Sequence, residues 1–118
     1  MSIQEILKAY GTVHVAVNGK EAVFAIVAAQ DVGEPYDLIC LDIMMPEMDG
    51  QEALKSIRDG EKKAGVMPGK GVKIIMTTAL GDSKNVMTSF KGLCDGYIVK
   101  PIDKAGLLKE IRKLSLIE

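Results

Sequence analysis

The sequence has no excess of charge of either sign, few cysteines and no long hydrophobic run. Its 15 basic and 16 acidic residues nearly cancel, so it lacks the cationic field that binds nucleic acid or an anionic membrane. Charged or turn residues interrupt every apolar stretch before the roughly 20 residues needed to cross a bilayer. The two cysteines, Cys40 and Cys94, form no CxxC pair, and the first residues do not resemble a signal peptide. We therefore expect a cytoplasmic protein that binds neither nucleic acid nor membranes directly.

The chain has 118 residues, of which 47% are hydrophobic and 26% charged. This is enough for one compact core and too little to divide comfortably into two. We therefore expect residues 1–118 to form a single domain.

Apolar periodicity and turn residues predict alternating helices and strands that begin and end with a helix. The predicted helices cover residues 2–10, 21–32, 50–58, 83–91 and, after an Asp103 cap, 104 to about 117; the predicted strands cover 12–16, 38–41, 72–77 and 96–99. Asn18-Gly19 is predicted to be a turn, and 59–71 a long surface loop. This order indicates an α/β fold with a parallel sheet and right-handed crossovers.

Three polar residues follow three of the predicted strands: Asp42, Thr78 and Lys100. Because ligands bind beyond the carboxyl ends of parallel strands, we expect the three side chains to converge. A carboxylate, a hydroxyl and an ammonium in one cleft suit transient phosphorylation of the carboxylate. Each residue taken alone has an equally good structural explanation as a cap or a solvated strand end.

The segment from Asp42 to Gly50, DIMMPEMDG, closely resembles the phosphorylation-site loop of response-regulator receiver domains. Thr77-Thr78-Ala79 and Lys100-Pro101 resemble the other two signature sites of that family, in the same order. The resemblance runs from about residue 3 to 116. It implies a flavodoxin-like, CheY-like parallel sheet with helices on both faces.

By this resemblance, Asp42 accepts a phosphoryl group from a histidine kinase or phosphotransfer protein, and Thr78 and Lys100 contact it. Ala79 is the small neighbour that leaves room for the group, and the Lys100-Pro101 bond is cis. Tyr97 occupies the position of an aromatic switch residue, although a half-buried strand tyrosine explains it equally well.

The remaining candidate ligands have simpler explanations. His14 has no second ligand near it in sequence, so we expect a surface or packing role. Met44, Met45, Met48 and Met76 are expected to be packing or loop residues rather than ligands of a soft metal.

The family begins with a central strand whose end supplies two acidic magnesium ligands, and nothing precedes Met1. Of the metal site, the resemblance leaves Asp42 and the backbone carbonyl of Met44, so we expect Mg²⁺ to bind weakly and phosphorylation to be slow or absent. A start codon misassigned at an internal methionine would also explain the missing strand.

Loss of the first strand would leave its two neighbours with unpaired edges. Either residues 13–16 close onto residues 38–41, or two chains pair, and we favour a homodimer.

Two functions remain open: a receiver module phosphorylated at Asp42, and a phosphorylation-independent interaction or dimerisation module. An enzyme acting on a separate substrate is disfavoured. Hydrolases that form an aspartyl phosphate carry a second aspartate where this chain has Met44, and Gly69-Lys70 does not complete a phosphate-binding loop.

Overall fold

The computed structural model describes residues 3–12, 14, 19–42, 50–67, 70–78 and 94–117. Its helices and strands, in chain order, are α1 Ile3–Leu7, α2 Gly19–Asp31, β1 Leu38–Asp42, α3 Gly50–Lys63, β2 Lys73–Thr78, β3 Gly96–Val99 and α5 Lys104–Lys113. The strands form one parallel sheet in the order β1-β2-β3, with Asp42 opposite Thr77 and Thr78 opposite Val99. The predicted α/β class and parallel sheet are confirmed.

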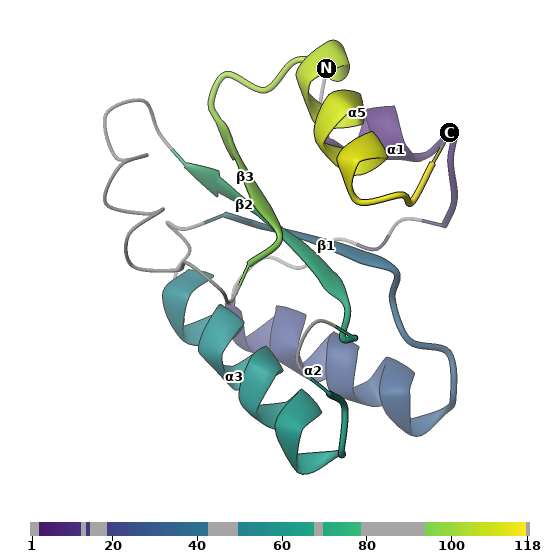
Figure 1. Ribbon diagram of the computed structural model, residues 1–118, viewed down its shortest axis with the longest axis vertical. Coiled ribbons are helices and arrows are strands. Elements are labelled where there is room, and N and C mark those ends of the chain that lie inside the picture. Colours follow the sequence, from purple (N-terminus) through teal and green to yellow (C-terminus); the bar gives the residue numbers. More distant parts are fainter. Residues whose placement is uncertain are drawn as a thin grey trace.

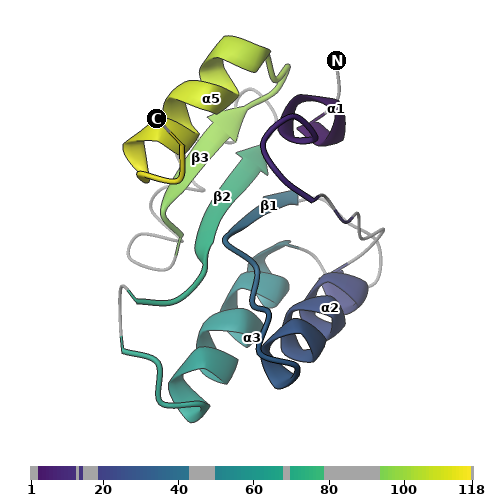
Figure 2. The same cartoon turned by 90° about the vertical axis from the view of Figure 1, so that its right-hand side faces the viewer.

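The sheet lies between two helical layers (Figures 1 and 2): α2 and α3 cover one face, and α1 and α5 cover the other. Successive side chains of β1 point to opposite faces of the sheet, so they contribute to two separate parts of the core. Ile39 and Leu41 pack toward α2 and α3, whereas Leu38 and Cys40 pack toward α1 and α5. Strands that are covered on both faces read as continuous apolar runs, which is why residues 38–41 contain no polar residue.

Several predicted boundaries are wrong. The helix α3 continues to Lys63, although residues 59–71 were predicted to be a loop throughout. The reason is that the buried Glu61 carboxylate accepts a hydrogen bond from the backbone N–H of Val72. Contacts distant in sequence therefore stabilise the last turn. Gly19 is the first residue of α2 rather than part of a turn, and α5 ends at Lys113 because Leu114 caps it and Ser115 has a φ of 60°.

Other predictions are confirmed or lie outside the described residues. Asp103 is the N-cap of α5, its Oδ1 accepting a hydrogen bond of 2.6 Å from the backbone N–H of Gly106. The predicted helix over 83–91 and most of the predicted strand over 12–16 fall outside the described residues. None of the described helices is both long and apolar enough to span a bilayer.

Candidate functional site

The carboxyl ends of the strands carry an ion pair between Asp42 and Lys100. Asp42 is the last residue of β1, and Lys100 directly follows β3. Because β2 lies between these strands, the lysine reaches across its end, and its Nζ donates to Asp42 Oδ2 at 2.5 Å. Two of the three predicted site residues therefore meet at one edge of the sheet.

The pair is too exposed to be explained as a stability element. The side chain of Lys100 is 45% exposed and that of Asp42 is 35% exposed. Ion pairs open to solvent to this degree contribute about 0 to 1 kcal/mol. A lysine beside an accessible carboxylate instead offers a positive charge next to an oxygen nucleophile, which is the arrangement that phosphorylation of the carboxylate needs.

Thr78 is the last residue of β2, next to both members of the pair. It lies opposite Val99, and its predecessor Thr77 lies opposite Asp42. The backbone register thus brings Thr78 to the same edge of the sheet, while the position of its side chain is not described. Ala79 and Met44, the other predicted contacts, lie outside the described residues.

Tyr97 lies in β3 opposite Met76 and is partly buried against the core between the sheet and the α2–α3 layer. The peptide bond between Lys100 and Pro101 is cis, as the family resemblance implies. His14 lies away from Asp42: its Nδ1 is 2.6 Å from the hydroxyl of Tyr36, which precedes the opposite end of β1. The surface role expected for His14 agrees with this position.

A partly buried polar cluster of Arg58, Glu61 and Asp95 at the other end of the sheet was not predicted. Arg58 donates to Glu61 at 2.7 Å and to Asp95 at 3.0 Å, and Asp95 in turn accepts from the backbone N–H of Ile74 at 2.8 Å. The spacing of Arg58 and Glu61, three residues apart on a helix, was the one available signal in the sequence. The cluster is a structural link between α3, β2 and the start of β3.

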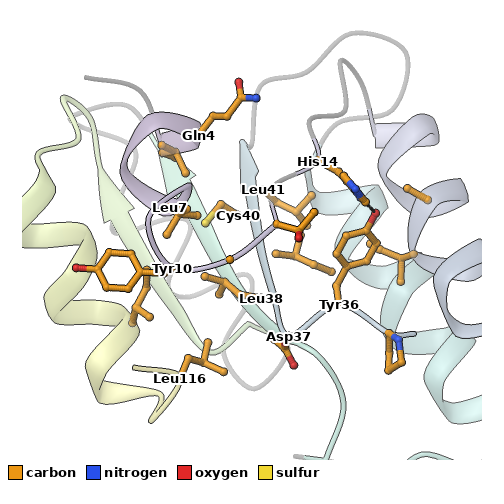
Figure 3. Close-up of a pocket in the computed structure, with 18 of the residues that line it drawn as sticks. Gln4, Leu7, Tyr10, His14, Tyr36, Asp37, Leu38, Cys40, Leu41 and Leu116 are labelled. Carbon is orange, nitrogen blue, oxygen red and sulfur yellow. Dashed lines mark hydrogen bonds between the residues drawn. The ribbon is translucent and has the colours of Figure 1, made fainter. Parts of the chain in front are cut away.

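A groove runs along the edge of β1 that faces away from β2, and it was not predicted as a feature (Figure 3). Its volume is about 1110 Å³. Leu7 and Leu116 line it from the α1–α5 side, and Tyr36 and Ile26 from the side of α2. Among the described strands, β2 is the only partner of β1, so the groove lies beside the open backbone edge of Leu38 to Leu41.

The described residues do not form a magnesium site. They include no group of three or more histidine, cysteine, aspartate or glutamate side chains arranged to hold a metal. Among the described residues, Asp42 is the carboxylate at the carboxyl ends of the strands, and it contacts Lys100. Magnesium requires several oxygen ligands, and this donor set falls short of that requirement.

An aspartate, a threonine and a lysine followed by a cis-proline lie at the carboxyl ends of successive parallel strands of this α/β fold. Residues 1–112 match the response regulator receiver domain, and the chain belongs to this family. Its fold is the flavodoxin-like CheY type, and its function is that of a receiver domain in two-component signal transduction. Receiver domains generally bind Mg²⁺ and exchange phosphoryl groups without being enzymes for a separate substrate.

The chain is 39% identical over 99 residues to the transcriptional regulatory protein ResD of Bacillus subtilis, covering 84% of this chain and 35% of ResD. It therefore spans about a third of that relative. Among solved structures, it resembles the receiver domain of Ssk1 from Saccharomyces cerevisiae, crystallised with the phosphotransfer protein Ypd1, with a TM-score of 0.76 and 28% identity over 94% of this chain and 77% of that one. It also resembles a structure of the CheX-CheY-BeF3-Mg complex from Borrelia burgdorferi, with a TM-score of 0.73 and 27% identity over 98% of this chain and 79% of that one.

Proposed function

We propose that residues 1–118 act as one receiver module whose phosphoacceptor is Asp42. The observation that carries the proposal is the contact of 2.5 Å between Asp42 and Lys100 across the end of β2. In this proposal a nucleophilic oxygen of Asp42 attacks the phosphorus of a phosphohistidine, the phosphorus–nitrogen bond breaks, and the phosphoryl group stays on the carboxylate as an acyl phosphate. Lys100 offsets the added negative charge, and Thr78 donates a hydrogen bond to a phosphoryl oxygen.

The partner in this proposal is a histidine kinase or a phosphotransfer protein of the cytoplasm. The complex of the related Ssk1 receiver with Ypd1 supports this class of partner. Ala79 leaves space for the phosphoryl group, and Tyr97 changes its rotamer in response to Thr78. The partly buried position of Tyr97 beside the core supports a side chain that moves between an inner and an outer position.

The reaction is proposed to be slow. Asp42 and the carbonyl of Met44 are the magnesium ligands that the family motif supplies here, so we expect weak Mg²⁺ binding. With few metal ligands, Lys100 is the main positive charge available to the transferred group. A single half-exposed lysine stabilises the transition state less than a divalent ion and a lysine together.

The test is incubation with acetyl phosphate, with and without Mg²⁺, followed by intact-protein mass spectrometry. We expect slow gain of one phosphoryl group, its loss in Asp42→Asn, and slower gain in Lys100→Ala. Asp37→Asn is the matched control, because Asp37 lies just before the amino end of β1 and Asp42 lies at its carboxyl end. Modification of Asp42→Asn at the wild-type rate would refute Asp42 as the acceptor.

The groove beside β1 favours a second candidate, an interaction module that works without phosphorylation. The groove lies beside the open backbone edge of β1, where an extended segment of a partner could pair with the strand. Wild-type protein that remains unmodified by acetyl phosphate with Mg²⁺ would favour this second function.

A further inference from the structure

The outward face of α2 carries an apolar stripe that no described element covers. Phe24 is 75% exposed and Val27 is 47% exposed, and the exposed Ala28 lies beside them. The opposite face of the helix, with Ala22 and Ile26, is buried against the core shared with α3. The helix therefore presents apolar side chains on both faces, whereas a surface helix normally presents one.

Charged residues of opposite sign close the two ends of this stripe. Lys20 lies at the amino end, Asp31 at the carboxyl end, and both are exposed. At 100° per residue, Lys20, Phe24, Val27 and Asp31 fall within an arc of about 60° on the helix surface. All four residues thus face the same direction, away from the sheet.

The stripe is complementary to itself when it is reversed. Its members lie symmetrically about the point between Ala25 and Ile26: positions 20 and 31 are equally far from it, as are 24 and 27. A second α2 packed antiparallel would place its valine over Phe24 and its aspartate beside Lys20. A twofold axis repeats every contact, so such an interface holds two of each pair.

We propose that α2 is the interface of a homodimer, in which two copies pack antiparallel about a twofold axis near Ala25. Phe24 packs against Val27 of the partner subunit, and Lys20 forms an ion pair with Asp31 of the partner subunit. The occupant is a second copy rather than another protein because the charges and the apolar residues of one stripe match those of the same stripe reversed. The proposal does not depend on Asp42, since α2 carries none of the proposed phosphoryl contacts.

The interface is small. Thirteen helical residues extend about 20 Å, so two such helices bury less area than a standard stable interface. We therefore expect a reversible dimer that dissociates on dilution through the micromolar range. Analytical ultracentrifugation of the full chain from micromolar to millimolar concentration measures this equilibrium directly. A monomer over the whole range would overturn the proposal.

Charge reversal tests the antiparallel register. Lys20→Asp alone and Asp31→Lys alone each replace two attractive pairs by two repulsive ones, and each should weaken dimerisation roughly tenfold. When the two variants are mixed, the introduced aspartate of one chain meets the introduced lysine of the other, and both pairs become attractive again. The mixture should therefore form a heterodimer over the same concentration range as the wild-type homodimer. Failure to do so would overturn the register.

Two further variants separate the interface from general effects of charge and folding. Phe24→Ser removes two aromatic contacts per dimer and should weaken association on the order of a hundredfold or more. Lys55→Asp and Asp59→Lys make the same charge changes on exposed positions of α3 and should leave dimerisation unchanged. Far-UV circular dichroism must show an unchanged helix content in each variant. Equal weakening by the α3 variants would count against the assigned face.

Discussion

Glu61 is a buried carboxylate whose removal tests how α3 is joined to the sheet. The residue is 6% exposed, and its carboxylate accepts hydrogen bonds of 2.7 Å from Arg58 and 2.7 Å from the backbone N–H of Val72. Glu61→Ala removes both acceptors at once. The N–H of Val72 then loses its partner, and Arg58 retains the carbonyl of Val72 and the carboxylate of Asp95.

The cost follows from these contacts. Breaking a buried ion pair by removing one member costs about 3 to 5 kcal/mol. The value here should be lower, because the Arg58 side chain is 19% exposed and keeps other acceptors. We expect Glu61→Ala to lower the free energy of unfolding by about 2 to 4 kcal/mol. Glu61→Gln keeps one acceptor oxygen and should lower it by about 1 to 2 kcal/mol.

Urea unfolding followed by far-UV circular dichroism measures both values, with Lys113→Ala as the control. Lys113 pairs with Glu110 at 3.2 Å, but its side chain is 61% exposed, so the control should lose less than about 1 kcal/mol. A Glu61→Ala variant no less stable than this control would refute the reasoning. Gly71→Ala offers an independent route, because a Cβ there would collide with the Glu61 carboxylate and displace it.

Two other predictions concern Cys40 and the cap of α5. Burial raises the pKa of the Cys40 thiol from 9.0 to about 11. In a Cys94→Ser background, iodoacetamide at pH 8 should therefore alkylate Cys40 roughly a hundredfold more slowly in the folded protein than in the urea-unfolded chain. The folded state holds this proton more tightly, so stability should fall as the pH rises from about 9 to about 11, and a Cys40→Ala variant with the same slope would contradict this. Asp103→Ala should lower the free energy of unfolding by about 1 kcal/mol. Gly106→Ala should stabilise the Asp103→Ala variant but not the wild type, where its Cβ would crowd the capping oxygen; equal effects in both would contradict the cap.

The sequence predicted those features that depend on neighbouring residues. The apolar run before Asp42 identified a strand covered on both faces, and Asp103 identified a helix start from its own capping chemistry. The approach of Lys100 to Asp42 also followed, because the carboxyl ends of parallel strands meet at one edge. The specific motif after Asp42 then pointed to the receiver family, which the match over residues 1–112 confirmed.

The features that were missed depend on residues distant in sequence. Residues 59–63, the part of α3 beyond the predicted helix, contain Gly60 and four charged residues, a composition typical of a loop. This part of α3 is helical because the Glu61 carboxylate accepts a hydrogen bond from the Val72 N–H, and Arg58 donates to Asp95, 37 residues away. The groove was likewise not predicted, since its walls come from α1, α2 and the chain after α5. The roles of Asp42, Thr78, Ala79, Tyr97, Lys100 and Met44 remain predictions.

The polar cluster of Arg58, Glu61 and Asp95 and the ion pair between Asp42 and Lys100 lie at opposite ends of β3. This strand has four residues, so few ladder hydrogen bonds fix its position. At its start, Asp95 accepts from the N–H of Ile74 and from Arg58, and its own N–H donates to the carbonyl of Ile74 at 2.8 Å. At its end, Lys100 reaches Asp42. The same four-residue strand therefore links the polar cluster at its start to the lysine–carboxylate pair at its end.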